Sequence, residues 1–395
     1  MKFFFTELFI FIKRENNREI KRLFFKFFKS FNHGLLYLDC RNLIREKNFS
    51  ALQNKIKSYI DSSISHKDYR FLYLIYSYEL RLGRYVDSIN HEFLGYKMHR
   101  PSTNDLVSLD EISKKDKLVI KLKEFDGQAV GSAISFFGLV KRLSSNFKNV
   151  YLFVEPRAIL IWKRSLKNYR NIKILGYNSY SYEVKRIGSY FFVNSTILKY
   201  LYIKDIEDIK ISLDEKMVAN IKKISELRKK YRKLNLPIIG LVYKSSNTGK
   251  ETPDIKFWKK IIENFQANYL ILQIGATNNE VEAFQKSASK SKSYVVLDQS
   301  IDFKGDLDDH FSQISSIDAL ISMPSSLVPF SNALGTKSIV ILDNLYTRNF
   351  PINESYSPWF PHATFFHKKD RDYSCVFDEV LEYLKKTKLD FLQSQ

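Results

Sequence analysis

The hydrophobic pattern of this chain changes character near residue 117. From there on, short apolar runs of strand length alternate with longer stretches that have the amphipathic period of a helix. The first four runs, which we predict to be strands, are KLVIKL (117–122), VYLFVE (150–155), NIKILGY (171–177) and YFFVN (190–194). Strands that alternate with helices predict βαβ units and a parallel sheet, so the expected fold class is α/β.

A second series of the same kind follows a long polar stretch. Residues 213–234, LDEKMVANIKKISELRKKYRKL, predict one helix that ends before Pro237. The strands predicted after it are residues 237–243, 269–275, 294–298, 319–323 and 338–342. Two α/β halves joined by a helix predict a cleft between them, and ligands of such sheets bind beyond the carboxyl ends of the strands.

The first hundred residues have a helical pattern throughout. In residues 16–31 the apolar side chains fall on one helix face and Lys and Arg fill the rest. Such a helix either packs on the protein or lies in the interface of an anionic membrane, and the pattern leaves both open. Phe49 and Tyr85 each mark a turn between predicted helices and lie 36 residues apart, close to the roughly 34 of a tetratricopeptide unit. We therefore predict a tetratricopeptide-like helical cap over residues 1–100, with a peptide-binding groove as the alternative.

The charge of the chain narrows the choice of partner. The 395 residues carry a net charge of +20, which favours anionic partners such as phosphates, nucleotide-sugars or acidic lipid headgroups. The basic residues are spread along the chain and no nucleic-acid-binding module is visible, so we predict no nucleic-acid partner. Cys40 and Cys375 lie far apart without partners at ligand spacing, which indicates neither a disulfide scaffold nor a zinc site.

The sequence shows neither a membrane-spanning segment nor a secretory signal. No run of 18 apolar residues is long enough to span a bilayer. The N-terminal FFFTELFIFI contains Glu7 and lacks a cleavage site, so it does not have the pattern of a secretory signal. We expect a cytoplasmic protein, held at the inner face of the cell membrane if residues 16–31 bind lipid.

The loop after the first strand of the second half has the composition of a phosphate site. KSSNTGK (244–250) places small hydroxyl residues and two lysines before a helix that Thr252 and Pro253 are predicted to open. Exposed backbone N–H groups and Lys charges suit a pyrophosphate, although the loop is not a Walker A sequence. The candidate ligands are Lys244, Ser245, Ser246 and Lys250. An ordinary turn between strand and helix is the alternative.

Three further loops follow predicted strands. In MPSSLV (323–328), Ser325 and Ser326 either cap the next helix or donate to a phosphate oxygen. In LQIG, Gln273 and Gly275 end a strand where the backbone can approach a nucleoside, or form a plain turn. In the first half, DGQAVGS (126–132) is a Gly-rich turn that lacks the full G-x-G-x-x-G spacing.

No catalytic group or metal site is evident from spacing. The seven histidines are scattered, and no H-x-x-x-H or G-x-S-x-G unit occurs. The two D-x-D strings, at residues 306–308 and 370–372, do not directly end predicted buried strands. We therefore predict no metal and no cofactor, which leaves basic residues and helix N-termini to hold a diphosphate.

At this point several segments resemble glycosyltransferase family 9, the heptosyltransferase-like group, in particular members with tetratricopeptide repeats before the transferase domain. The segments are DALISMPSSLVPFSNALGTKSIVIL (318–342), SPWFPHATFF (357–366) and LQIG, and the resemblance covers about residues 117–386. Lys250 before Thr252-Pro253 is similar to the phosphate-contacting Lys of the family. The resemblance implies a GT-B fold, with two Rossmann-like domains facing a nucleotide-sugar cleft, and sugar transfer without a D-x-D metal.

The resemblance also fixes the expected domains. They are a helical region over residues 1–100, an acceptor domain over 117–212, a linker helix over 213–234 and a nucleotide-sugar domain over 235–395. The polar residues 101–116 form a linker in front of the acceptor domain.

The chain departs from the family at its motif residues. The motif Asp of the family falls on Pro324 here, and its His falls on Pro329. In the acceptor loop, which here contains Gly127, Gly131 and Ser132, the base Asp of the family is replaced by Ser132. A serine is no general base at neutral pH without help. Asp126 and Glu124 in the same loop are the candidates to replace it.

The function that we expect is transfer of a sugar from a nucleotide-sugar to a cell-surface glycan or a lipid-linked acceptor. Stabilisation of the leaving diphosphate would then be the main contribution to the rate. The alternative is a catalytically inactive relative that binds a nucleotide-sugar or acts as a scaffold at the membrane surface. A third possibility is a peripheral membrane adaptor that acts through residues 16–31 and the repeats.

Overall fold

The computed structural model describes most of the chain after residue 117 and a few segments before it. The described residues are 51, 54–55, 76, 79, 84–99, 117–122, 130–187, 190–213, 215–233, 235–244, 252–303, 305, 307–342, 350, 354–368 and 373–393. The chain divides into two compact units. One contains residues 1–102, 245–252 and 343–353, and the other contains residues 103–244, 253–342 and 354–395.

The helix α6 (Tyr85–His99) is the main described element of the first unit. Tyr85, Ile89 and Phe93 are spaced four residues apart and are all buried, so they form the apolar face of α6. The predicted turn residue Tyr85 is the first residue of this helix. Phe49 and the amphipathic residues 16–31 lie outside the described residues, so the repeats and the membrane helix stay predictions.

The first half of the second unit contains a parallel four-stranded sheet of order β3-β2-β1-β4. The strands are β1 (Lys117–Lys121), β2 (Asn149–Val154), β3 (Ile172–Gly176) and β4 (Phe191–Asn194). The helices between and after them are α8 (Val130–Ser135), α9 (Phe137–Ser144), α10 (Ile159–Ser165), α11 (Tyr180–Ile187), α12 (Ser195–Tyr202) and α13 (Ile206–Leu213), with short 3-10 turns η2 (Pro156–Ala158) and η3 (Tyr177–Ser179). The central strand β1 is buried on both sides, because consecutive residues Leu118, Val119 and Ile120 are all inaccessible to solvent.

The second half contains a parallel six-stranded sheet of order β10-β9-β8-β5-β6-β7. Its strands are β5 (Ile238–Val242), β6 (Asn268–Ile271), β7 (Tyr294–Val296), β8 (Ala319–Ser322), β9 (Lys337–Leu342) and β10 (Ala363–His367). Its helices are α14 (Ile221–Tyr231), α15 (Ile255–Asn264), α16 (Asn278–Lys290), α17 (Leu307–Ser315), α18 (Leu327–Leu334) and α19 (Ser374–Gln393). Counted from β5, this is the 3-2-1-4-5-6 order of dinucleotide-binding sheets.

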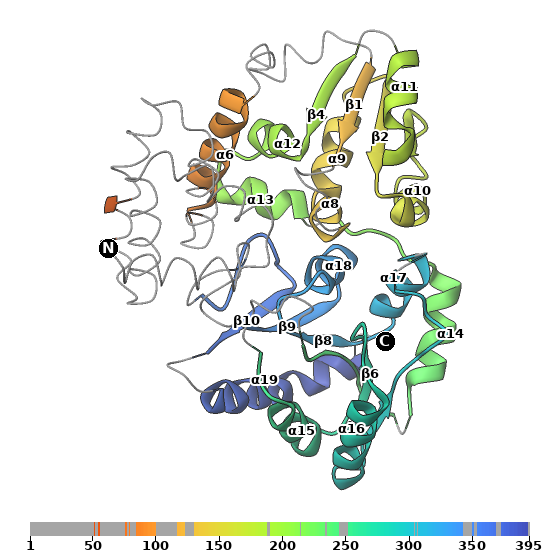
Figure 1. The fold of residues 1–395 in the computed structure, drawn as a ribbon, viewed down its shortest axis with the longest axis vertical. Coiled ribbons are helices and arrows are strands. Elements are labelled where there is room, and N and C mark those ends of the chain that lie inside the picture. The colour runs from red at the N-terminus through yellow and green to blue at the C-terminus, as the bar shows by residue number, and fades with distance from the viewer. Residues whose placement is uncertain are drawn as a thin grey trace, which may run out of the picture. The chain divides into compact units, whose positions relative to one another are not determined.

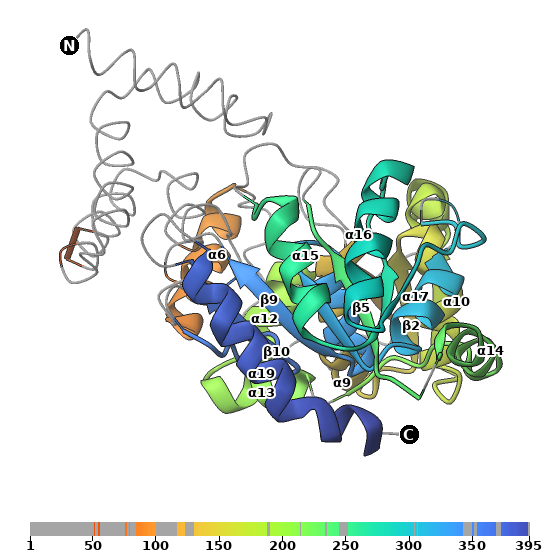
Figure 2. The ribbon, with the colours of Figure 1, turned by 90° about the horizontal axis from the view of Figure 1, so that it is seen from below.

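Helices cover both faces of the six-stranded sheet. On one face α15, α16 and α19 pack together, and Trp258, Phe284 and Val380 from these helices join one apolar core with the strands (Figures 1 and 2). On the other face α18 packs on β8 and β9 and contacts α17, which contacts α14. Right-handed crossovers produce this two-sided arrangement, because the chain reverses its direction across the sheet after β7.

The prediction of two parallel α/β sheets is confirmed, and the predicted strands agree with the observed ones to within a few residues. The strand β10 was missed, because its residues ATFFH follow a proline-containing segment and lie at the sheet edge. Among the described residues no helix has the length and apolar character needed to cross a membrane.

Two predicted helices are wrong in their limits. Residues 213–234 do not form one helix: α13 ends at Leu213, residues 215–220 are not helical, and α14 begins at Ile221. The physical reason is Asn220, whose side chain accepts a hydrogen bond from the Lys223 N–H and starts a new helix. Similarly, Asp254 rather than Thr252 caps α15, by accepting a hydrogen bond from the Phe257 N–H at 3.0 Å.

A buried carboxylate attaches α14 to the six-stranded sheet. Asp318, just before β8, accepts hydrogen bonds from Arg228 and Arg232 of the α14 segment and from the Ile238 N–H at 2.8 Å. Its side chain is inaccessible to solvent. The Asp318 carboxylate and the Ile238 N–H are therefore both hydrogen-bonded at the amino-terminal edge of β5 and β8.

We predict that Asp318→Ala lowers the free energy of unfolding by about 3–5 kcal/mol, because it leaves two guanidinium groups without their buried acceptor. Urea denaturation measures this change. The control is Lys290→Ala, which removes the exposed Lys290–Glu263 pair and should cost less than about 1 kcal/mol. Equal effects of the two substitutions would contradict the prediction.

Candidate functional site

The candidate site lies where the connections of the six-stranded sheet reverse direction. From β5 the chain proceeds to β6 and β7 on one side, whereas β8, β9 and β10 lie on the other. Ligands of open α/β sheets bind beyond the carboxyl ends of the two strands at such a switch point. Val242 and Ser322 are register partners at the ends of these strands, and the Met323 N–H donates to the Val242 carbonyl at 3.0 Å. The two loops after β5 and β8 therefore leave the sheet side by side.

Lys244 is fixed at this edge by two neighbours. Its backbone N–H donates to the Gln273 side-chain oxygen at 3.0 Å, and its ammonium group donates to both carboxylate oxygens of Glu280 at 2.9 and 3.0 Å. The Gln273 amide also donates to the Ile274 carbonyl at 3.1 Å. The buried Gln273 side chain thus connects the ends of β5 and β6 through hydrogen bonds. The Lys244 ammonium group is ion-paired with Glu280.

Glu280 is the residue of this site that the sequence did not predict. It is the third residue of α16 and forms a capping box with Thr277. The Tyr243 hydroxyl donates to the same carboxylate at 2.9 Å. Burial alone raises the pKa of Glu280, but hydrogen bonds from Lys244, Thr277 and Tyr243 outweigh it and lower the pKa to about 2. Glu280 is therefore ionised at neutral pH, and it balances the charge of Lys244 at the carboxyl end of β5.

In the turn after β8, some of the hydrogen-bonding groups bond to one another and are not available to a ligand. The Ser325 hydroxyl lies 3.0 Å from the Ser322 hydroxyl and accepts from the Leu327 N–H at 3.2 Å. Pro329, the third residue of α18, has no N–H to offer. The helix N-terminus is still present, but it has fewer unoccupied donors than the first turn of an ordinary helix. The Ser325 hydroxyl thus accepts from the first N–H of α18, whereas the exposed Ser326, which is the N-cap residue, makes no side-chain capping bond.

Gly275 ends the LQIG segment with a left-handed backbone. Its φ is +74°, and a Cβ built there would meet no atom within 4 Å. The position is therefore exposed and needs glycine for its conformation rather than for space. The backbone of Gly275 is therefore open to the approach of a ligand.

The structure brings one predicted acceptor-loop residue against the second half. Gly131, in α8, lies so close to α18 that a Cβ added to it would be 2.9 Å from Pro329 Cγ and 3.3 Å from the Ser326 carbonyl oxygen. Pro329 stands where the resembling family has its motif His. The two halves are therefore in direct contact at this point, through a glycine and a proline ring.

The remaining predicted site residues are not placed. Glu124, Asp126, Gly127, Ser245, Ser246 and Lys250 lie outside the described residues, and Ser132 is described only as part of the α8 backbone. Their roles stay predictions. The structure brings together Lys244, Gln273, Gly275 and the Ser325–Ser326 turn at one edge of the sheet, as parallel strands require.

A scan against models of protein families finds no match. A search of curated proteins also finds none.

Among the solved structures to which the chain is similar are the following three glycosyltransferases. The glycosyl transferase family 9 structure from Veillonella parvula DSM 2008 is 11% identical, with a TM-score of 0.47, and the match covers 72% of this chain and 99% of that chain. E. coli ADP-heptose lps heptosyltransferase II is 11% identical, with a TM-score of 0.45, and the match covers 70% and 99%. E. coli heptosyltransferase WaaC with ADP-2-deoxy-2-fluoro heptose is 8% identical, with a TM-score of 0.41, and the match covers 69% and 99%.

We predict that Gly131→Ala destabilises the protein, although alanine favours a helix by about 1 kcal/mol. The added Cβ presses on a proline ring that cannot rotate away, and such overpacking costs about 1–3 kcal/mol. Denaturant unfolding measures the change. The double variant Gly131→Ala with Pro329→Ala has room for the methyl group and should recover most of the loss. A Gly131→Ala protein as stable as the wild type would contradict the contact.

We also predict a pH-dependent effect of Glu280→Gln. Because the folded state lowers the pKa of Glu280 to about 2, the carboxylate stabilises the fold above its unfolded pKa of about 4.3. This contribution disappears as the pH falls from about 4.3 towards 2. The variant should lose about 1–2 kcal/mol at pH 7 and roughly half of that at pH 3, as measured by urea unfolding at both values. A difference that does not shrink at pH 3 would contradict this assignment.

Proposed function

We propose that this chain is a glycosyltransferase that uses a nucleotide-sugar donor. The observation that carries the proposal is the switch point between β5 and β8, where the candidate residues of three different loops meet at one sheet edge. The sequence resemblance to family 9 supports the same site, because its longest segment (318–342) forms β8, α18 and β9 and its LQIG segment directly follows β6. The net charge of +20 suits an anionic donor.

The described contacts refine the roles of the donor-site residues. Lys250, Ser245 and Ser246 are proposed to bind the diphosphate, and so are Ser325 and Ser326 in the turn before α18. Gln273 and Gly275 are proposed to line the nucleoside. Lys244 is proposed to support the site rather than to present a full positive charge to the diphosphate. The Glu280 carboxylate already neutralises its ammonium group.

The proposed reaction is an inverting displacement at the anomeric carbon. The acceptor hydroxyl oxygen forms the new bond to that carbon while the bond to the diphosphate oxygen breaks, and the diphosphate leaves with the electron pair. Asp126 or Glu124 is proposed to take the hydroxyl proton. Lys250 and the backbone N–H groups would stabilise the negative charge on the leaving oxygen. A cell-surface glycan or lipid-linked acceptor and a location at the cytoplasmic side of the membrane belong to this proposal.

A second candidate function is nucleotide-sugar binding without catalysis. The contact between Gly131 and Pro329 favours it, because the resembling family has its motif His at Pro329 and its base after Gly131. In this chain the two positions pack against each other through apolar atoms. A scaffold or sensor at the membrane surface would keep such a fold and lose the transfer reaction.

We predict that purified protein binds a nucleoside diphosphate or its sugar in a thermal-shift panel, because a ligand at about 100 times its Kd stabilises the native state by about 2.7 kcal/mol. Lys250→Ala should weaken binding about 10- to 100-fold, since it removes a charge-assisted hydrogen bond. Ser325→Ala should also weaken nucleotide binding. The control is Lys290→Ala, a substitution at an exposed residue at the end of α16, which should leave binding unchanged.

Three outcomes separate the proposals. If Lys250→Ala and Ser325→Ala bind as the wild type does, the site is wrong. If the wild type binds the donor and releases its diphosphate with an acceptor, Asp126→Asn or Glu124→Gln should slow release about 100-fold or more. Donor binding without transfer across the acceptor panel supports the non-catalytic function instead.

A further inference from the structure

A histidine is buried where α17 packs on α18. His310, in α17, is only 1% exposed. Its ring stands nearly perpendicular to the ring of Phe303, with the centroids 4.6 Å apart, and its centroid lies 6.4 Å from that of Phe330 in α18. The next residue of α17, Phe311, packs on the same Phe330 ring at 4.8 Å. The contact between the two helices is therefore aromatic, and one of its rings can take up a proton.

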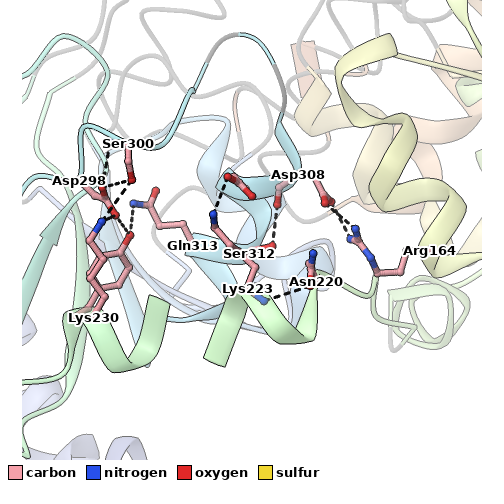
Figure 3. A network of polar contacts seen from close by, with 11 residues as sticks. Arg164, Asn220, Lys223, Lys230, Asp298, Ser300, Asp308, Ser312 and Gln313 are labelled. Carbon is pink, nitrogen blue, oxygen red and sulfur yellow. Dashed lines mark hydrogen bonds and ion pairs between the residues drawn. The ribbon is translucent and has the colours of Figure 1, made fainter. Parts of the chain in front are cut away.

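A chain of hydrogen bonds connects this histidine to a buried carboxylate. The Tyr231 hydroxyl donates its proton to Asp298 at 2.5 Å, so its oxygen can only accept from the Gln313 amide nitrogen, which lies 3.1 Å away (Figure 3). The Gln313 carbonyl oxygen then lies 3.3 Å from Nδ1 of His310. Because this oxygen is an acceptor, Nδ1 carries the proton of the neutral ring. The chain of bonds therefore leaves Nε2 of His310 with a lone pair and no proton.

Asp298 fixes the direction of these bonds. Burial raises its pKa, but hydrogen bonds from Lys230, Ser300 and Tyr231 outweigh burial and lower the pKa to about 2. The Lys230 ammonium group and the Ser300 hydroxyl each lie 2.7 Å from the carboxylate (Figure 3). Asp298 is therefore ionised throughout the pH range in which a histidine titrates. It remains the acceptor of the Tyr231 proton over that range.

Nε2 of His310 has no hydrogen-bond partner in the part of the chain that the structure describes. Protonation would place a positive charge and a new N–H donor there, at a position closed to water. Attraction between a cation and the Phe ring faces offsets only part of the cost of burying that charge. Burial accordingly lowers the pKa of His310 to about 4, and the bond to Gln313 opposes this shift without cancelling it.

The charged groups on the elements around His310 are paired or exposed. α18 contains none. On α17, Asp308 accepts two hydrogen bonds from Arg164 of α10 at 2.8 and 2.7 Å, and Asp309 pairs with Lys223 of α14 at 3.1 Å (Figure 3). Asp302, in the loop before α17, is exposed. The other cations of α14 and of the η2 turn that bind carboxylates are Arg157, Arg228, Lys230 and Arg232.

We propose that His310 is an acid-sensitive switch, and that its protonation breaks the packing of α17 on α18. The neutral ring fits the aromatic contact, whereas the imidazolium ring has no acceptor for its second N–H and must reach water. The proposal is independent of the proposed function, because it rests on the contacts of α14, α17 and α18 alone. α18 follows directly on the Ser325–Ser326 turn, so the switch would act next to the candidate site.

The sign of the pH effect follows from the two states of the histidine. In the packed state the pKa of His310 is about 4, whereas a histidine in water has a pKa of about 6.5. The packing therefore keeps its full stability above about pH 6.5 and loses stability as the pH falls toward about 4. Between pH 7 and pH 5, the equilibrium constant for opening should rise about 20-fold through this one residue.

The first experiment measures opening by hydrogen–deuterium exchange of the full chain at pH 7 and pH 5, corrected for the intrinsic effect of pH on exchange. In the wild type, peptides from α17 and α18 should lose about 20-fold in protection at pH 5, whereas α16 should keep its protection. His310→Gln, which does not titrate, should show no such loss. His310→Phe takes its place if glutamine prevents folding. The matched control is His367→Gln in β10, which should behave like the wild type.

The second experiment determines the tautomer by NMR of the full chain labelled with ¹⁵N-histidine at pH 7. The His310 signal is the one missing from His310→Gln, and it should show the proton on Nδ1. Tyr231→Phe frees the Gln313 amide to rotate, so both tautomers should then appear. Three results would each overturn the proposal: a wild-type proton on Nε2, α18 protection that is unchanged between pH 7 and pH 5, or an equal loss in His310→Gln.

Discussion

The parallel pairing of β5 with β8 is the constraint on which the rest of this structure depends. The two strands are neighbours in the sheet, although the segment that contains β6 and β7 lies between them in the sequence. Because β5, β6, β7 and β8 are all parallel, their carboxyl ends lie at the same edge of the sheet. Lys244, Gln273 and Ser325 are neighbours for this reason, and not because any local motif gathers them.

Charge at this edge is balanced inside the protein. A net charge of +20 favours an anionic partner, but the ammonium group of Lys244 at the end of β5 is already bound by Glu280. Asp308, Asp318 and Asp298 each bind basic side chains elsewhere in the second unit. Much of the basic character near the sheets thus stabilises helices and the connection between the halves. A diphosphate at the switch point would depend on the few donors that these pairs leave.

The sequence predicted the architecture well, because buried parallel strands are continuous apolar runs that can be recognised one by one. It did not predict β10, whose edge position and proline-rich approach weaken the same signal. It also predicted one helix over residues 213–234 and so included the non-helical residues 215–220, since the Asn220 cap that starts α14 is a single polar residue in a polar stretch. The Thr277-x-x-Glu280 spacing could have revealed the capping box, but not the bond to Lys244. Contacts such as Arg164–Asp308 join residues that lie 144 positions apart, and spacing carries no information about them.

The central claim is that the carboxyl edge of β5, β6 and β8 binds a nucleoside diphosphate. Photo-crosslinking with an azido nucleoside diphosphate, followed by mass spectrometry of the labelled peptides, tests it most directly. The account predicts labels in the peptides around Tyr243–Lys244, around Gln273–Glu280 and around Ser322–Ser326, and loss of these labels with excess unmodified nucleotide. Labels confined to the opposite edge of the sheet, near Leu236 and Asp318, or no competable label at all, would contradict it.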